Sequence, residues 1–220
     1  MTSPGSNPFA IDYYFSVLSD WAYFGGDRLE ALARRLGVRI NYMPMKLAKI
    51  YEATGGILLQ KRSKERQDYR VVELERWRDF LGLPITIHPR FYPVDDALSS
   101  CAIIASLASS SDTGRLVNLI HRAIWVEEKD ISCPAVLAPI LQVVGMDPDS
   151  TLRAARSREI LEQLELNTQQ AISRGVFGSP FYCLRDEIFW GQDRLEFLER
   201  SLVRLINSNG IPLEHVSSTG

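Results

Sequence analysis

The sequence predicts an α/β fold in which a long, all-helical insertion separates the two halves of a small sheet. Segments rich in aromatic and β-branched residues occur near both ends of the chain, at 11–17, 38–43, 181–184 and 187–190. Between 51 and 175, apolar residues instead recur every three or four positions, as in amphipathic helices. The order β-α-β, helices, β-β-α predicts a thioredoxin-like sheet.

The first part of the sheet is a predicted β-α-β unit. Ile11–Val17 has the composition of a buried strand, and Val38–Met43 alternates like a half-buried one. Between them, Trp21–Leu36 has helical spacing, with a start near Ser19 and a stop at Gly37. Strands joined in this way are usually parallel, with a right-handed crossover. We therefore expect a parallel pair.

The insertion is predicted to be helical throughout, with no convincing strand between Tyr51 and Gly175. Its helices are expected at 58–81, 95–108, 113–128, 134–144 and 157–174. This pattern divides the chain into a helical insertion domain at 51–175 and a discontinuous thioredoxin-like domain at 11–50 and 176–208.

The chain returns to the sheet as a predicted hairpin. Phe181–Leu184 and Glu187–Trp190 flank the short turn Arg185-Asp186, and Gly191-Gln192-Asp193 opens a last helix that runs to about Leu205. Residues 1–10 and 209–220 are expected to be flexible tails. The first ten lack the basic and apolar regions of a signal peptide.

Composition argues against several classes of function. The net charge of −2 is unlike the basic excess of nucleic-acid-binding proteins, and no apolar run approaches the roughly 20 residues that span a bilayer. Cys101, Cys133 and Cys183 form no CxxC pair, so we expect no redox dithiol and no metal site. An odd cysteine count without a signal peptide favours the reducing cytoplasm. The histidines are scattered as well: His88, His121 and His215.

Ser19 stands between a strand and a helix, where two interpretations are open. A serine there is most often only an N-cap that accepts a backbone N–H from the first turn. The same position allows a chemical role, because a helix N-terminus stabilises an anion such as a thiolate. Its hydroxyl then donates a hydrogen bond to the sulfur of a bound thiol.

Two later patterns also have a common and a functional interpretation. Gly178-Ser179-Pro180 is either an ordinary turn or holds a cis peptide bond that presents the Ser179 backbone to an extended peptide ligand. In Gly191-Gln192-Asp193, Asp193 either complements the last helix dipole or pairs with a ligand ammonium, while N–H groups hold a carboxylate. Each pattern alone is common, but all three in this order are much less so.

Three stretches carry a resemblance to a known family: FSVLSDWAYFGGDRLEALARRLG, KLAKIYEATGG and GVFGSPFYCLRDEIFWGQDRLEFLE. They resemble the 2-hydroxychromene-2-carboxylate isomerases and the related kappa-class glutathione transferases, both in the DsbA-like branch of the thioredoxin superfamily. The resemblance implies a DsbA-type fold, a homodimer and glutathione as the cofactor. It also implies that Ser19 is the catalytic residue that faces the glutathione sulfur.

The same resemblance implies the residues that bind glutathione. Ser179, before Pro180, would pair with the cysteinyl part through its backbone, and Gln192 and Asp193 would hold the γ-glutamyl end. Arg66 takes the place of a basic residue on the first inserted helix, which is usually lysine.

The chain departs from the family pattern at three places. Asp20 stands where the family commonly has proline, so its carboxylate either lies beside the thiolate and raises the thiol pKa or points outward. Gly56 stands where relatives often have asparagine. The segment Phe91–Asp95 lacks the basic residues found in the substrate-facing stretch of the naphthalene-pathway isomerases.

The function that the resemblance implies is a glutathione-dependent cis-trans isomerase of conjugated aromatic pyruvates, acting through a transient glutathione adduct in aromatic-compound degradation. A kappa-class-like transferase and a non-catalytic glutathione-binding protein stay open as alternatives. A dithiol oxidoreductase is disfavoured by the missing CxxC. Basic residues near the inserted helix are candidates for attracting an aromatic carboxylate substrate: Lys46, Lys49, Lys61, Lys64 and Arg66.

Overall fold

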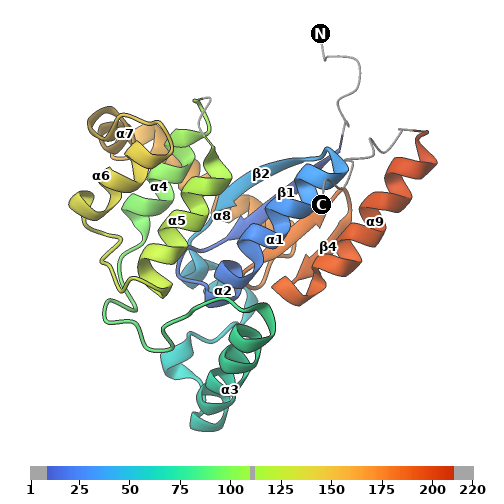
Figure 1. The fold of residues 1–220 in the computed structure, drawn as a ribbon, viewed down its shortest axis with the longest axis horizontal. Helices are drawn as coiled ribbons and strands as arrows, with labels where there is room; N and C mark the ends of the chain where they lie inside the picture. The colour runs from blue at the N-terminus through green and yellow to red at the C-terminus, as the bar shows by residue number, and fades with distance from the viewer. Residues whose placement is uncertain (1–8, 110–111, 211–220) are drawn as a thin grey trace.

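The computed structural model describes residues 9–109 and 112–210, and the centre of this part is a four-stranded mixed sheet (Figure 1). β1 (Ala10–Phe15) is parallel to β2 (Arg39–Pro44) and antiparallel to β3 (Phe181–Leu184), and β3 pairs with β4 (Glu187–Trp190). The order across the sheet is β2-β1-β3-β4. The four predicted strands and the parallel first pair are confirmed.

Helix α1 (Asp20–Leu36) connects β1 to β2 and begins and ends where the sequence predicts. Ser19 is its N-cap, in extended conformation, and its side chain accepts the N–H of Ala22. Gly37 closes the helix with φ of 64°, a left-handed conformation that favours glycine.

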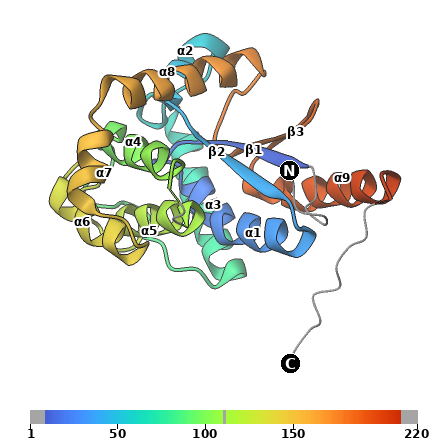
Figure 2. The same cartoon turned by 90° about the horizontal axis from the view of Figure 1, so that it is seen from above.

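Helices cover both faces of the sheet, as the view from above shows (Figure 2). α1 and α9 (Leu195–Ser208) lie on one face, and α2 (Leu47–Thr54) and α8 (Arg158–Ser173) lie on the other. Since successive strand residues point to opposite faces, Tyr13 joins the core under α1 and Tyr14 joins the core under α2 and α8.

The rest of the insertion lies beside and beyond the sheet. In Figure 1, α3 projects below the sheet and α4 to α7 group to one side. Their bounds are α3 (Lys64–Leu81), α4 (Ala97–Ser106), α5 (Thr113–Trp125), α6 (Pro134–Val143) and α7 (Pro148–Ala154), and the 3-10 turns are η1 (Leu59–Lys61) and η2 (Gln192–Arg194). Among the described residues from 51 to 175 there is no strand, as predicted.

Three differences concern short elements. The sequence analysis did not predict α2 or α7, because helices of eight and seven residues are too short to show a repeating apolar stripe. The long helix expected from residue 58 begins at Lys64 and is preceded by η1.

Two boundaries predicted from the sequence, the end of the N-terminal tail and the start of the insertion domain, fall within regular secondary structure. Phe9 and Ala10 fall in the predicted N-terminal tail, but Phe9 is buried in the core and Ala10 begins β1. The remainder of that tail and residues 211–220 lie outside the described residues. Helix α2 spans the predicted domain boundary after residue 50, and the division into two domains stays a prediction.

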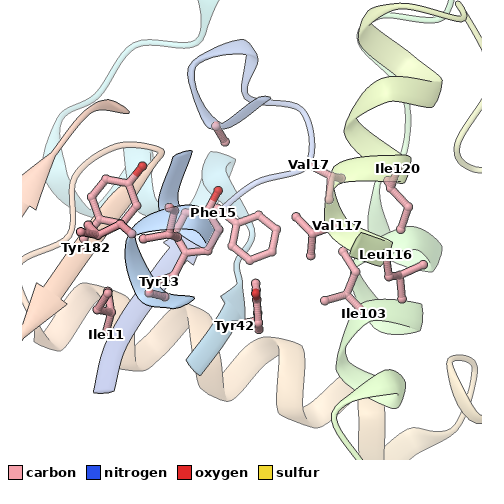
Figure 3. Packing of buried hydrophobic residues seen from close by; sticks show 14 of the residues in the cluster. Ile11, Tyr13, Phe15, Val17, Tyr42, Ile103, Leu116, Val117, Ile120 and Tyr182 are labelled. Atoms are coloured by element: carbon pink, nitrogen blue, oxygen red, sulfur yellow. The ribbon is translucent and has the colours of Figure 1, made fainter. Parts of the chain in front are cut away.

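One continuous apolar core joins the sheet to the insertion (Figure 3). Tyr13 stacks on Phe15 and Tyr182, with ring centroids 4.4 and 5.4 Å apart. Val117 and Ile120 of α5 belong to the same cluster and lie near the end of β1. Burial of apolar surface stabilises the folded state by about 25 cal/mol per Å². The insertion is thereby held against the end of β1, where the candidate site lies.

Candidate active site

Two adjoining cavities lie where the C-terminal end of β1 meets the insertion. The larger has a volume of about 480 Å³ and extends from Ser19 towards the start of α4, and the smaller, of about 340 Å³, extends towards β4 and η2. They share four lining residues: Trp21, Tyr51, Arg62 and Ser179. Together they form one cleft that passes Ser19 and Ser179.

Ser19 joins the start of α1 to the segment before β3. Its Oγ accepts the N–H of Ala22 at 3.2 Å and donates to the carbonyl oxygen of Ser179 at 3.0 Å. The side chain is buried at the wall of the larger cavity. The N-cap role is confirmed, and the positive end of the 17-residue helix α1 faces the cleft at this point.

The Ser179–Pro180 peptide bond is cis, as predicted. Ser179 Oγ accepts the N–H of Ser16 at 3.0 Å, and Pro180 O accepts the N–H of Gly191 at 3.0 Å. These bonds fix the segment against the end of β1 and against the start of η2. A second cis bond, at Tyr92–Pro93, lies at the larger cavity and was not predicted.

Gln192 and Asp193 lie on η2 at the smaller cavity, and the last helix begins after them. Gln192 is buried, and its side-chain oxygen accepts a hydrogen bond from Arg28 of α1. Asp193 is exposed and pairs with Arg194 at 2.9 Å. Gly191 has φ of 101°, and a Cβ there would lie 2.5 Å from Asp193 Oδ1, so the turn requires glycine. Of the two residues, Asp193 is the one whose side chain is accessible to a ligand.

Asp20 takes neither of the two orientations expected from the sequence. It is buried at the larger cavity, and its carboxylate forms an ion pair with Arg70 of α3. The N–H of Trp21 also donates to it at 2.8 Å. Burial raises the pKa of Asp20, and Arg70 opposes that rise. The pair is formally neutral, so Asp20 does not add a free negative charge beside Ser19.

Gly56 leaves room for an aromatic side chain from α2. A Cβ at Gly56 would lie 2.2 Å from the ring of Tyr51, so any side chain there would displace this ring. Tyr51 lines both cavities, and Arg62 Nη2 approaches its hydroxyl at 3.4 Å. Tyr51 therefore occupies the space next to position 56 in this chain.

The basic residues at the cleft are only partly those named from the sequence. Arg66 is exposed on α3 and lines neither cavity. Arg62 lines both cavities, and Arg70 lines the larger one. Lys46 and Lys49 are at the larger cavity but both pair with Glu165 of α8, at 3.1 and 2.7 Å. Lys61 and Lys64 are exposed. Helix spacing gave no signal for this difference, because Arg62, Arg66 and Arg70 follow one another at four-residue intervals although Arg66 is exposed and Arg62 precedes α3.

Asp96 is a residue that the sequence analysis did not single out. It lines the larger cavity, where Ser16 Oγ donates to its carboxylate at 3.2 Å. Burial raises the pKa of Asp96 to about 6. No local motif marks this position.

No thiol or imidazole of the described residues lines the cleft. Cys101 and Cys183 are buried and free, Cys133 is half-buried at the start of α6, and none of them lines either cavity. Burial raises the pKa of Cys101 to about 11 and also raises that of Cys183. His121 is buried, with its pKa lowered to about 4, and His88 is exposed. His215 lies outside the described residues.

Within the described residues, no group of histidine, cysteine, aspartate or glutamate side chains is arranged to hold a metal ion. The helices of residues 9–109 and 112–210 include none with the length and hydrophobicity needed to span a bilayer. The cleft itself offers a helix N-terminus with a hydroxyl, the backbone of Ser179 on its wall, a carboxylate and a guanidinium. Such a set can bind an extended, charged peptide with its thiol at Ser19.

Comparisons with known proteins agree with this geometry. A model of the DSBA-like thioredoxin domain matches residues 10–203. The chain is 30% identical over 200 residues to a 2-hydroxychromene-2-carboxylate isomerase of Pseudomonas putida, covering 90% of this chain and 97% of that protein. It is 25% identical over 206 residues to glutathione S-transferase kappa 2 of Caenorhabditis elegans, covering 86% and 89%. A solved structure of a 2-hydroxychromene-2-carboxylate isomerase is similar with a TM-score of 0.79 at 29% identity, covering 91% and 98%.

Proposed function

The chain belongs to the 2-hydroxychromene-2-carboxylate isomerase family within the DSBA-like thioredoxin domains, and from this premise we propose that it is a glutathione-dependent isomerase. The proposed reaction interconverts a 2-hydroxychromene-2-carboxylate and the open, conjugated aromatic pyruvate. The observation that carries the proposal is the hydroxyl of Ser19, held at the N-terminus of α1 and 3.0 Å from the carbonyl oxygen of Ser179.

The donors of the cleft fit glutathione, a tripeptide with one thiol, one ammonium and two carboxylates. Ser179 offers backbone groups to the cysteinyl residue, and Asp193 offers a carboxylate to the ammonium. Arg62 lines both cavities, and no carboxylate of the described residues pairs with it. We assign Arg62 to a carboxylate of the ligands, while a role for Arg66 stays a prediction without support from its position.

When bound, glutathione supplies a thiolate that adds reversibly to a conjugated double bond, so that the bond can rotate. A free thiol has a pKa of about 8.5, which leaves only a few per cent ionised at neutral pH. The end of α1 and the Ser19 hydroxyl favour the charged form of a sulfur placed there. Each unit by which they lower the thiol pKa corresponds to about 1.4 kcal/mol and roughly tenfold more thiolate.

The hydroxyl of Ser19 has a single proton, which the structure shows donated to Ser179 O. An extended peptide that pairs with Ser179 brings an N–H to that same carbonyl oxygen. This N–H replaces the Ser19 hydroxyl as donor, and the hydroxyl is then free to turn to the sulfur. Ligand binding and thiolate stabilisation are thereby coupled at one carbonyl group.

The larger cavity suits an aromatic substrate. Its volume of about 480 Å³ lies within the range of small-molecule sites, and much of its wall is apolar or aromatic, including Met45, Leu58 and Tyr92. It opens directly beside Ser19. A ring bound there places its conjugated chain next to the sulfur position.

We test the proposal by titrating the protein with glutathione at pH 7 and recording the thiolate difference absorbance, for the wild type and Ser19→Ala. Ser157→Ala is the matched control, because Ser157 caps α8 in the same way through the N–H of Ile160, away from the cleft. We expect the band in the wild type and the control, and its loss in Ser19→Ala with at least a tenfold drop in isomerisation rate. Absence of glutathione binding in the wild type would refute the proposal.

A further inference from the structure

Asp96 stands at the N-cap of α4, but its carboxylate does not cap that helix. At four other helices the N-cap side chain, Ser19, Asp112, Asp147 or Ser157, accepts an N–H from the first turn. The carboxylate of Asp96 instead lies at the larger cavity and accepts from Ser16 Oγ at 3.2 Å. The helix forgoes a cap that is typically worth about 1 kcal/mol, and the carboxylate is held towards the ligand space.

A second polar group at the same end of the cavity has no partner. Ser100 lies one turn after Asp96 on α4, is 1% exposed and lines the larger cavity. Its hydroxyl makes no hydrogen bond within the described chain. A buried hydroxyl without a partner costs about 1–3 kcal/mol, which a ligand oxygen would recover. Asp96, Ser16 and Ser100 thus form a polar end to a largely apolar cavity.

The charges nearest to Asp96 are mostly engaged with other groups. Lys46, before α2, is held by Glu165 of α8 at 3.1 Å. Asp95, on the same loop as Asp96, is exposed at the rim of the same cavity and accepts the N–H of Ala97 at 2.9 Å, and its charge contributes to the raised pKa of Asp96. No described cation forms an ion pair with Asp96, and its hydrogen-bond donor is the neutral hydroxyl of Ser16.

Two neutral titratable side chains and one ion pair complete these surroundings. Cys101 on α4 and His121 on α5 are neutral near pH 7, since burial raises the pKa of the thiol to about 11 and lowers that of the imidazole to about 4. Asp20, elsewhere on the cavity wall, is neutralised by Arg70. Of Asp20 and Asp96, Asp96 is therefore the carboxylate of this wall that has no ion-pair partner among the described residues.

The geometry points to Asp96 as an acid–base catalyst, with Ser16 and Ser100 completing a subsite for the carbonyl oxygen of the substrate. The catalytic role of Asp96 rests on the proposed isomerase function, whereas the subsite for the carbonyl oxygen does not. When a nucleophile bonds to the conjugated carbon, the displaced electron pair reaches the carbonyl oxygen, which takes a proton from neutral Asp96. When that bond breaks, the electron pair returns and the carboxylate of Asp96 takes the proton back. No net proton is consumed.

The protonation of Asp96 suits this role. With a pKa of about 6, roughly a tenth of the side chains are neutral at pH 7. Ionised and neutral forms are then both accessible near the working pH, the condition under which a general acid is most effective.

The binding half of the inference is tested without glutathione. Benzylideneacetone, a conjugated aromatic ketone with no carboxylate, is titrated by calorimetry at pH 6.5 in buffers of different ionisation enthalpy. A ketone oxygen that hydrogen-bonds to neutral Asp96 raises its pKa, so the wild type should take up a fraction of a proton per ligand. Asp96→Asn should bind without uptake, and Asp149→Asn, which removes an exposed charge on α7 outside both cavities, should behave like the wild type.

The catalytic half is tested with the same variants and saturating glutathione. Asp96→Asn should keep the thiolate band but lose at least about 100-fold in kcat/KM for isomerisation, and Asp149→Asn should stay within about threefold. In the wild type, kcat/KM should fall as pH rises through the pKa of Asp96. The pH–rate profile of Asp96→Asn should lack this fall. Thermal melting confirms that each variant is folded.

The outcomes separate the two proposals. Proton uptake that is unchanged in Asp96→Asn, or activity within threefold of the wild type, overturns the role of Asp96. A rate that rises with pH through this pKa contradicts its action as an acid. If the wild type shows no thiolate band with glutathione, the proposed function is refuted instead. The ketone titration then still decides whether Asp96 forms the subsite.

Discussion

Three aspartates line the larger cavity, of which Asp95 is exposed, and the other two, Asp20 and Asp96, differ in their surroundings. Asp20 has the guanidinium of Arg70 and the N–H of Trp21 against its carboxylate, whereas Asp96 has the hydroxyl of Ser16 and no ion pair with a described cation. Burial raises the pKa of both carboxyls. A cation offsets much of the cost of burying a carboxylate, and a hydroxyl offsets little of it.

This difference separates a structural role from a chemical one. The Asp20–Arg70 pair links the first turn of α1 to α3 across the cavity wall, so its value lies in holding two elements together. Asp96 joins the loop after β1 to the start of α4, but it does so with a group that changes charge near neutral pH. The same residue type thus serves as a fixed contact at one place and as a titrating group at the other.

The largest effect is expected from breaking the ion pair. Arg70→Met leaves Asp20 buried without a cation, and the free energy of unfolding at pH 7.5 should fall by about 3–5 kcal/mol in urea titrations. Arg66→Met, four residues earlier on the exposed face of α3, should change it by less than about 0.5 kcal/mol. Asp20→Asn combined with Arg70→Met should recover most of the loss. A loss below about 1 kcal/mol for Arg70→Met would show that water solvates Asp20.

A smaller effect of opposite sign is expected at Asp96. Its pKa is about 6 in the fold, against about 3.9 in an unfolded chain, so folding favours the neutral form. The contribution of Asp96 to stability is full below pH 4 and is lost as pH rises through 6. Asp96→Asn should therefore be more stable than the wild type at pH 8, by at most about 3 kcal/mol, and nearly equal to it at pH 4. Urea titrations at both values test this, and equal stability at pH 8 would contradict it.

The smallest effect is expected from the hydroxyl that faces Asp96. Ser16 donates to the carboxylate and so favours its charged form, and Ser16→Ala should raise the pKa of Asp96 further. The change should be less than about one unit, because a single hydrogen bond contributes roughly 0.5–1.5 kcal/mol. A ¹³C-NMR titration of the aspartate carboxyls, assigned through Asp96→Asn, measures it. A fall in this pKa would show that Ser16 does not act as the donor.

The fold was predictable from sequence where its elements carry a repeating pattern. The strands have their aromatic and β-branched composition, and α1 has a serine cap and a glycine stop. Helix α2 was missed because Ile50 is its single buried residue, so it shows no apolar stripe. Its position is set by packing against α8, more than a hundred residues later in the chain.

The candidate site was predictable where one local pattern sets the chemistry. Ser19 and Ser179 follow from strand, turn and helix signals within a few residues of each. Arg70 and Asp96 have no such signal, because each is defined by a partner 50 or 80 positions away, Asp20 and Ser16 respectively. Arg66 shows the converse: the family position suggested it, but the helix turns it to solvent.

The placement of the three cysteines has a consequence for how the protein responds to oxidants. Thiols that react with peroxide or form mixed disulfides are exposed and have a low pKa. Cys101 and Cys183 are instead buried, with raised pKa values. Cys133 lies outside both cavities. Under the proposed function, the reactive sulfur belongs to glutathione, so the protein would have no nucleophile of its own to be oxidised. Its rate would then follow the supply of reduced glutathione, and activity would return as soon as that supply recovered, with no repair of the protein.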